Sequence, residues 1–203
     1  ICRNAAHHFD RLYEAYGDRG LVVFKHFPIN RRCNNHVKRS KHRYACIAAK
    51  AAECAGDQGK FWPYLSLAFR NQHNLGVRSL RAHAAGLGLD SDRFRQCLSE
   101  RAVSAGVKRD TDELGGLEKM RKSTPKVLIN GELYLGGVSA EGLAKGIEEA
   151  LAAVGASGAS KSADFARKEA PPIAADVPAM RSLSYGQTRF AIDTFESGKD
   201  DDG

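Results

Sequence analysis

The 203-residue sequence lacks any apolar run near the roughly 20 residues that a helix needs to cross a bilayer, so no membrane-spanning helix is expected within it. It also lacks an internal repeat, which argues against a solenoid or propeller. Its most basic stretch, RRCNNHVKRSKHR, has no interleaved aromatic residues that could stack on bases. We therefore interpret that stretch as a solvated loop and expect no nucleic-acid partner.

The first residue is Ile1 and not methionine, and no signal peptide is recognisable. We expect a chain that is truncated at its start, so the missing leader does not exclude secretion, and an upstream membrane anchor stays open. The composition, with 42% hydrophobic and 27% charged residues, is that of an ordinary soluble globular protein. The formal net charge of +7 is modest.

The chain has five cysteines, which is an odd number, so at least one of them has no cysteine partner within the chain. If Cys2 pairs with a residue upstream of Ile1, the other four can form two disulfides. That arithmetic favours an oxidising compartment. Three pairings are open among these four, which are Cys33, Cys46, Cys54 and Cys97.

Hydrophobic periodicity predicts an α/β protein with the order helix, strand, helical block, hairpin and helix. In the first helix Phe9, Leu12 and Tyr16 recur at three- and four-residue spacing. Asn130-Gly131 is a strong signal for a two-residue hairpin turn. The expected ranges are 4–16 for the first helix, 21–27 for the strand, about 41–120 for the helical block, 127–129 and 133–135 for the hairpin, and 140–154 for the last helix.

Residues 155–203 change in character and become small, polar and proline-bearing. This composition predicts a linker or a disordered tail, in which RFAIDTFES is compatible with one short strand. At the other end, a strand in front of the first helix would complete a parallel crossover unit. We therefore expect the first strand of the sheet upstream of Ile1.

Cys2 lies at the start of the first predicted helix. Unpaired N–H groups and the positive end of the helix dipole at such a position favour a thiolate, the reactive form. In a C-x-x-C pair the outer cysteine attacks and the inner one resolves the mixed disulfide. Cys2 is placed as the inner cysteine; the alternative is a lone buried cysteine that packs as a small hydrophobe.

Thr124-Pro125 opens a strand directly after a helix, where an X-Pro bond is often cis. A cis peptide beside a dithiol would leave the preceding backbone N–H and C=O available to an extended substrate chain. The alternative is a trans proline that merely starts an edge strand.

Four segments stand in the order and at the spacing of one family: VVFKHFPI, AAECAGDQGKFWPYLSLAFRNQ, LGLDSDRFRQCL and STPKVLING. Through them residues 1–154 resemble the DsbA-like thioredoxin-fold oxidoreductases, in the bacterial branch with a helical insertion. The resemblance implies a thioredoxin-like α/β fold over residues 1–154, with the insertion at about 41–120 and the first strand missing from the chain.

The family motif is C-P-x-C, so Ile1 and Cys2 match its last two positions, and the nucleophilic cysteine and its proline would be the two residues before Ile1. Pro125 matches the family's cis-proline, and Thr124 matches the residue that faces the dithiol. The resemblance thus implies a protein thiol–disulfide oxidoreductase in the bacterial periplasm or cell envelope. Its partners would be cysteine-containing protein substrates and a redox partner protein, without a cofactor.

Because the nucleophile is absent from the chain, we expect the 203 residues alone to be incompletely active. A non-catalytic thioredoxin-like binding or scaffold module is the alternative function. It is distinguished by the residue two positions before Ile1, where the enzyme needs a cysteine.

The spacing C-x-x-H and H-x-x-x-C at Cys33, His36, His42 and Cys46 would also suit a zinc ion. We favour a disulfide between Cys33 and Cys46 over a metal site, because a related branch of the family carries a similar cysteine-bearing insertion here. Closing a loop of this length contributes about 3 kcal/mol in the usual model. Cys54 and Cys97, both on helices of the insertion, either pair or stay as core thiols.

Overall fold

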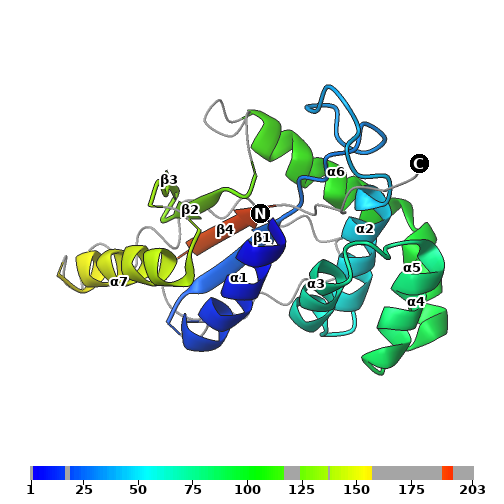
Figure 1. The fold of residues 1–203 in the computed structure, drawn as a ribbon, viewed down its shortest axis with the longest axis horizontal. Helices are drawn as coiled ribbons and strands as arrows, with labels where there is room; N and C mark the ends of the chain where they lie inside the picture. Colours follow the sequence, from blue (N-terminus) through cyan, green and yellow to red (C-terminus); the bar gives the residue numbers. More distant parts are fainter. Residues whose placement is uncertain (1, 17–18, 117–123, 137, 157–188, 194–203) are drawn as a thin grey trace. The chain divides into compact units, whose positions relative to one another are not determined.

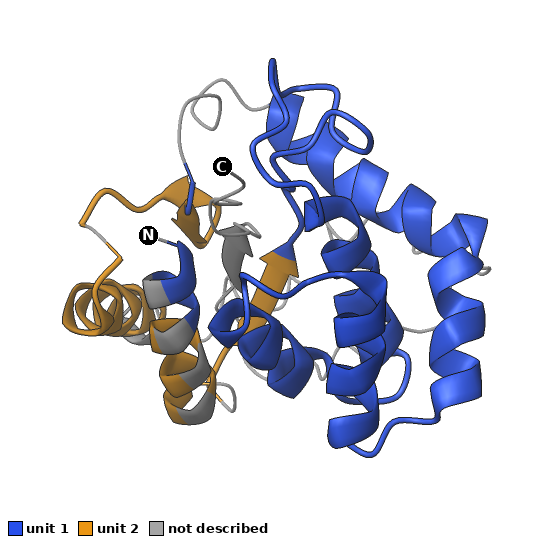
Figure 2. Cartoon of the chain, turned by 45° about the vertical axis from the view of Figure 1, so that its right-hand side comes forward, with its two compact units in different colours: residues 1–7, 25–125, 193–203 blue, residues 8–24, 126–192 orange. Residues whose placement is uncertain are grey.

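The computed structural model describes residues 2–16, 19–116, 124–136, 138–156 and 189–193 (Figure 1). The chain divides into two compact units, which are described separately (Figure 2). Unit 1 comprises residues 1–7, 25–125 and 193–203, and unit 2 comprises residues 8–24 and 126–192. Helix α1 (Cys2–Tyr16) begins in unit 1 and continues into unit 2. Within the described ranges, no helix has both the length and the apolar character needed to cross a membrane.

Unit 1 consists mainly of five helices, and α2 lies at their centre, packed against the other four. Alanines allow this packing, since those of α2 are fully buried and their small side chains let neighbouring helices approach closely. The helices correspond to the predicted helical block, of which residues 117–120 lie outside the described residues. They are α2 (Ala45–Gly56), α3 (Phe61–Arg70), α4 (Val77–Gly86), α5 (Ser91–Ser99) and α6 (Arg101–Gly116).

Two disulfides connect segments of unit 1 and select one of the three pairings that the sequence left open. Cys33 is bonded to Cys46, which closes a loop of 13 residues in front of α2. Cys54 is bonded to Cys97 and joins α2 to α5 across a sequence separation of 43. Both sulfurs of the second pair are buried among the helices.

The sheet of the structure has four strands in the order β1-β4-β2-β3. The hairpin of β2 and β3 is antiparallel, and Asn130 and Gly131 form its turn with φ values of 52° and 85°. The strands are β1 (Leu21–Lys25), β2 (Val127–Ile129), β3 (Glu132–Leu133) and β4 (Arg189–Asp193).

The return strand of the hairpin is shorter than predicted and ends at Leu133 instead of Leu135. The reason is that β2 has only three residues, so the ladder ends with the bond from Tyr134 N to Val127 O. Leu135 lies beyond these partners and is 86% exposed.

The sheet also contains the one short strand that the sequence allowed within the C-terminal tail. Strand β4 comes from that tail and pairs antiparallel with β2, with Leu128 opposite Ala191. It lies between β1 and β2, beside the strand that follows the first helix. Residues 157–188 and 194–203, the rest of the predicted tail, lie outside the described residues.

Helix α7 (Ala140–Ala156) extends two residues beyond its predicted end. Together with α1 and the sheet it forms the apolar interior of unit 2, where the predicted stripe of the first helix is found. An apolar pocket there is lined by Phe9, Leu12, Tyr16, Val22, Val127, Leu143 and Ile147.

Candidate active site

Cys2 is the first residue of α1 and the one cysteine outside the two disulfides. Its side chain is buried, with 2% of its surface exposed. The thiol therefore lies at a helix N-terminus, where backbone N–H groups lack helical partners and the dipole favours negative charge. This is a position at which a sulfur can become a thiolate.

Thr124 and Pro125 lie beside this thiol in unit 1. The Cys2 Sγ donates a hydrogen bond to Thr124 Oγ1 at 3.6 Å. The Thr124–Pro125 peptide bond is cis, and Pro125 lies two residues before the start of β2. The structure thus brings together the three residues that the sequence analysis selected for the catalytic site.

The hydroxyl of Thr124 suits both protonation states of the sulfur. A threonine hydroxyl carries one donor and two acceptor positions, and its hydrogen rotates. It accepts a bond from the thiol of Cys2 and can donate one to the thiolate. The pair can therefore support a sulfur that gains and loses a proton during disulfide exchange.

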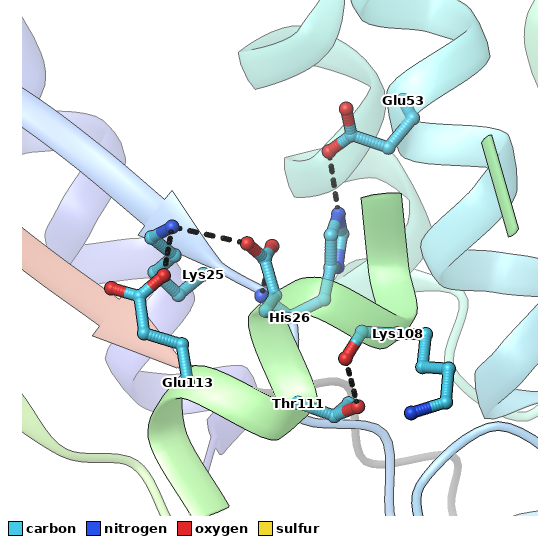
Figure 3. A network of polar contacts seen from close by, with 7 residues as sticks. Lys25, His26, Glu53, Lys108, Thr111 and Glu113 are labelled. Atoms are coloured by element: carbon cyan, nitrogen blue, oxygen red, sulfur yellow. Dashed lines mark hydrogen bonds and ion pairs between the residues drawn. The ribbon is translucent and has the colours of Figure 1, made fainter. Parts of the chain in front are cut away.

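Sequence reasoning missed a network of polar contacts in unit 1 around the last residue of β1 (Figure 3). Lys25 Nζ lies 3.2 Å from Asp110 Oδ1 and 2.9 Å from Glu113 Oε2 of α6. Burial opposes the charge of the ammonium, but the two carboxylates outweigh it and raise the pKa of Lys25. Lys25 is therefore held as a cation at the end of the strand.

The neighbouring His26 extends this network to α2. Its backbone N–H donates to Asp110 Oδ2 at 2.9 Å, and its Nε2 lies 2.7 Å from Glu53 Oε1. The only sign of this network in the sequence was a charged residue, Lys25, at the end of the apolar run LVVFK. The carboxylate partners of Lys25 are 85 and 88 residues away along the chain, so no local pattern shows them.

The four residues with metal-like spacing do not form a metal site in the structure. The sulfurs of Cys33 and Cys46 are bonded to each other and offer no thiolate. His36 Nε2 lies 3.4 Å from Asp112 Oδ1 of α6, which turns it towards a carboxylate.

The comparison with protein families decides the identity of the fold. A family model described as Thioredoxin matches residues 1–149. The chain belongs to the thioredoxin family. The predicted fold class, a thioredoxin-like α/β fold with a helical insertion, is thereby confirmed, and α2 to α6 form the insertion.

Curated relatives of this thioredoxin-family chain carry the names of antiporters. The Na(+)/H(+) antiporter NhaA 1 of Salinispora arenicola (strain CNS-205) is 34% identical over 64% of the chain and 18% of its own length. The Na(+)/H(+) antiporter NhaA of Herminiimonas arsenicoxydans is 33% identical over 68% of the chain and 20% of its own length. The thioredoxin-family chain thus spans about a fifth of these relatives. No solved structure matches it significantly.

Proposed function

We propose that the chain is the DsbA-like thioredoxin domain of a protein thiol–disulfide oxidoreductase. The observation that supports this most strongly is the contact between Cys2, at the N-terminus of α1, and Thr124, which directly precedes Pro125. Membership of the thioredoxin family supports the same reaction class. A cysteine two positions before Ile1 completes the proposed site as Cys-Pro-Ile-Cys.

In the proposed reaction the outer thiolate attacks one sulfur of a substrate disulfide. A mixed disulfide forms, and the other substrate sulfur leaves as a thiolate. The thiolate of Cys2 then attacks the outer sulfur, closes the disulfide of the domain, and releases the second substrate thiolate, which takes up a proton. Two electrons pass to the substrate, and a dithiol of a redox partner protein returns them to the domain. Run in reverse, the same steps oxidise a substrate dithiol.

Thr124 and Pro125 have positioning roles in this proposal. Thr124 keeps the sulfur of Cys2 in place and hydrogen-bonded in both protonation states. The backbone of Thr124 and Pro125 pairs with the extended chain of the substrate and aligns its sulfur with the dithiol. No cofactor takes part, since the electrons move between sulfur atoms.

The proposed location is outside the cytoplasm, in the periplasm or cell envelope. Two disulfides in one small domain support it, because such bonds persist in oxidising compartments. The antiporter names belong to relatives of which about four fifths have no counterpart in this chain, so ion transport is not assigned to it.

The decisive experiment adds Cys-Pro before Ile1 of the full chain and measures the reduction of insulin disulfides by a dithiol donor. We expect catalysis from this protein and none from the control that carries Ser-Pro instead. With Cys-Pro added and Cys2→Ser, we expect trapped mixed disulfides with substrate, because attack proceeds and resolution does not.

If the Cys-Pro protein is folded and inactive, and its Cys2→Ser variant traps no substrate, the oxidoreductase proposal is wrong. The chain would then be the binding or scaffold module. Melting curves of the three proteins show whether they are equally folded.

A further inference from the structure

The loop between β1 and α2 carries a strong positive charge. We call residues 29–44 the basic lobe. No Asp or Glu occurs anywhere between residue 19 and residue 52. The lobe contains six exposed basic residues, which are Arg31, Arg32, Lys38, Arg39, Lys41 and Arg43.

The structure folds the two ends of the lobe against each other. The backbone N–H of Arg31 donates to Ser40 Oγ at 3.0 Å, and that of Lys41 donates to Ile29 O at 2.9 Å. Arg31 therefore lies beside the segment that holds Arg39 and Lys41. Basic residues that are eight to ten positions apart in the sequence share one surface.

Buried side chains keep the lobe in this shape. Asn30 is 3% exposed, and its amide donates to the carbonyls of His42 and Arg43 at 2.8 and 3.1 Å. Asn34 is fully buried and donates to Pro28 O at 3.0 Å. The disulfide of Cys33 closes the lobe covalently. A surface held in this way loses little conformational entropy when it binds a partner.

The charges of the lobe are not neutralised within the described part of the chain. None of the six basic side chains has an ion pair there, and the guanidinium of Arg43 lies above the ring of Tyr44, 5.4 Å from its centroid. Six cationic groups thus face solvent on one rigid loop, which favours an anionic partner.

The lobe lacks the anchors that a protein partner or a single-stranded nucleic acid would require. Protein interfaces are organised around buried aromatic or aliphatic anchors, whereas the aliphatic Val37 is half-buried and Tyr44 lies beneath Arg43. Single-stranded nucleic acid needs aromatic platforms for its bases. An anionic phospholipid surface attracts clustered arginines and lysines electrostatically and needs no such anchor.

We propose that the basic lobe docks the domain reversibly on anionic phospholipid headgroups. Each arginine or lysine near such a surface strengthens the attraction, which decays within a Debye length. The docking needs no membrane-spanning segment of this chain. It is independent of the redox role of Cys2, so either proposal can fail without the other.

The experiment measures flotation of the full chain with vesicles. We expect binding to vesicles of phosphatidylglycerol mixed with phosphatidylcholine and none to vesicles of phosphatidylcholine alone. Raising the salt from about 0.1 M to about 1 M should release the protein, since the Debye length falls from about 10 Å to about 3 Å. Inorganic phosphate at matched ionic strength should not release it.

Two matched charge variants distinguish the effect of the basic lobe on vesicle binding from the effect of the net charge of the protein. Lys38→Glu with Arg39→Glu should weaken vesicle binding by about tenfold or more. Arg78→Glu with Arg81→Glu on α4, two residues that are also exposed, changes the net charge by the same amount and should leave binding within about twofold. Equal melting temperatures show that both variants are folded.

Three outcomes would overturn the proposal. The first is no preference for phosphatidylglycerol, and the second is an equal loss of binding in the two charge variants. The third is release of the protein from anionic vesicles by inorganic phosphate, duplex DNA or an acidic peptide at an ionic strength that does not itself release the protein. That result would assign the lobe to the competing ligand.

Discussion

The thiol of Cys2 donates a hydrogen bond of 3.6 Å to the hydroxyl of Thr124, although 122 residues separate the two in the sequence. The contact joins the first residue of α1 to the segment that leads into β2, within unit 1. It places a hydroxyl beside the only cysteine that is not in a disulfide.

Replacing Thr124 should change the reactivity of Cys2. Thr124→Val keeps the shape of the side chain but removes the group that donates to the thiolate. A hydrogen bond to a charged group contributes about 1.5–3 kcal/mol, so we expect alkylation of Cys2 by iodoacetamide at neutral pH to slow by about tenfold or more. Thr124→Ser retains the hydroxyl and should react at nearly the original rate. Equal rates for the Val and Ser variants would show that the hydroxyl does not stabilise the thiolate.

Removing each disulfide should reduce stability according to the loop that it closes. The Cys54–Cys97 bond spans 43 residues and the Cys33–Cys46 bond spans 13. In the chain-entropy model the double alanine variants lose about 4 and about 3 kcal/mol of unfolding free energy, respectively. Urea denaturation followed by circular dichroism measures both. A smaller loss for the Cys54–Cys97 variant than for the other would contradict the entropic account.

Asp57 should make the stability of the protein depend on pH. Burial raises the pKa of its carboxyl above the ordinary 3.8, with Glu53 adding to this effect and Arg93 opposing it. The folded state therefore disfavours the carboxylate, and stability is lost as the pH rises through the folded pKa. Asp57→Asn should melt at a higher temperature than the original protein at pH 7. The gain should vanish below about pH 4, where both forms are neutral. A gain that persists at pH 3 would exclude this explanation.

Strand β4 should protect the amides of β2. Ala191 lies opposite Leu128, and a proline there has no N–H and cannot continue a central strand. We expect Ala191→Pro to increase hydrogen exchange at Val127, Leu128 and Ile129. Ala191→Val, which suits a strand, should leave exchange unchanged. Equal exchange in both variants would show that the tail does not occupy the sheet in solution.

Much of the fold could be predicted from local patterns. The apolar spacing of α1 and α7 and the Asn130-Gly131 turn are short-range signals, and each led to an element at nearly the correct position. The insertion was predictable because helix propensity and breakers alternate along it. The bounds of β3 were wrong although those of β2 were right, because the two-residue turn places Glu132 opposite Ile129 and starts the return strand one residue earlier than predicted.

The candidate site could be predicted for a different reason. A cysteine at a helix start is stabilised as a thiolate, and a Thr-Pro pair before a strand is often joined by a cis peptide bond. Each feature therefore suggested a role by itself, and the resemblance to one family connected the two. The ion pairs of Lys25 had no such signal, since Asp110 and Glu113 are ordinary surface-type residues of a helix.

The sequence by itself determined the order of helices and strands, the α/β class and the identity of Cys2, Thr124 and Pro125 as candidates, because periodicity, turn residues and motif spacing act over a few positions. The tertiary structure alone decided that Cys54 and Cys97 pair, which carboxylates hold Lys25, how the two halves of the basic lobe meet, and where β4 enters the sheet. These are contacts between segments far apart in the chain, and packing selects them from many alternatives that local sequence leaves open.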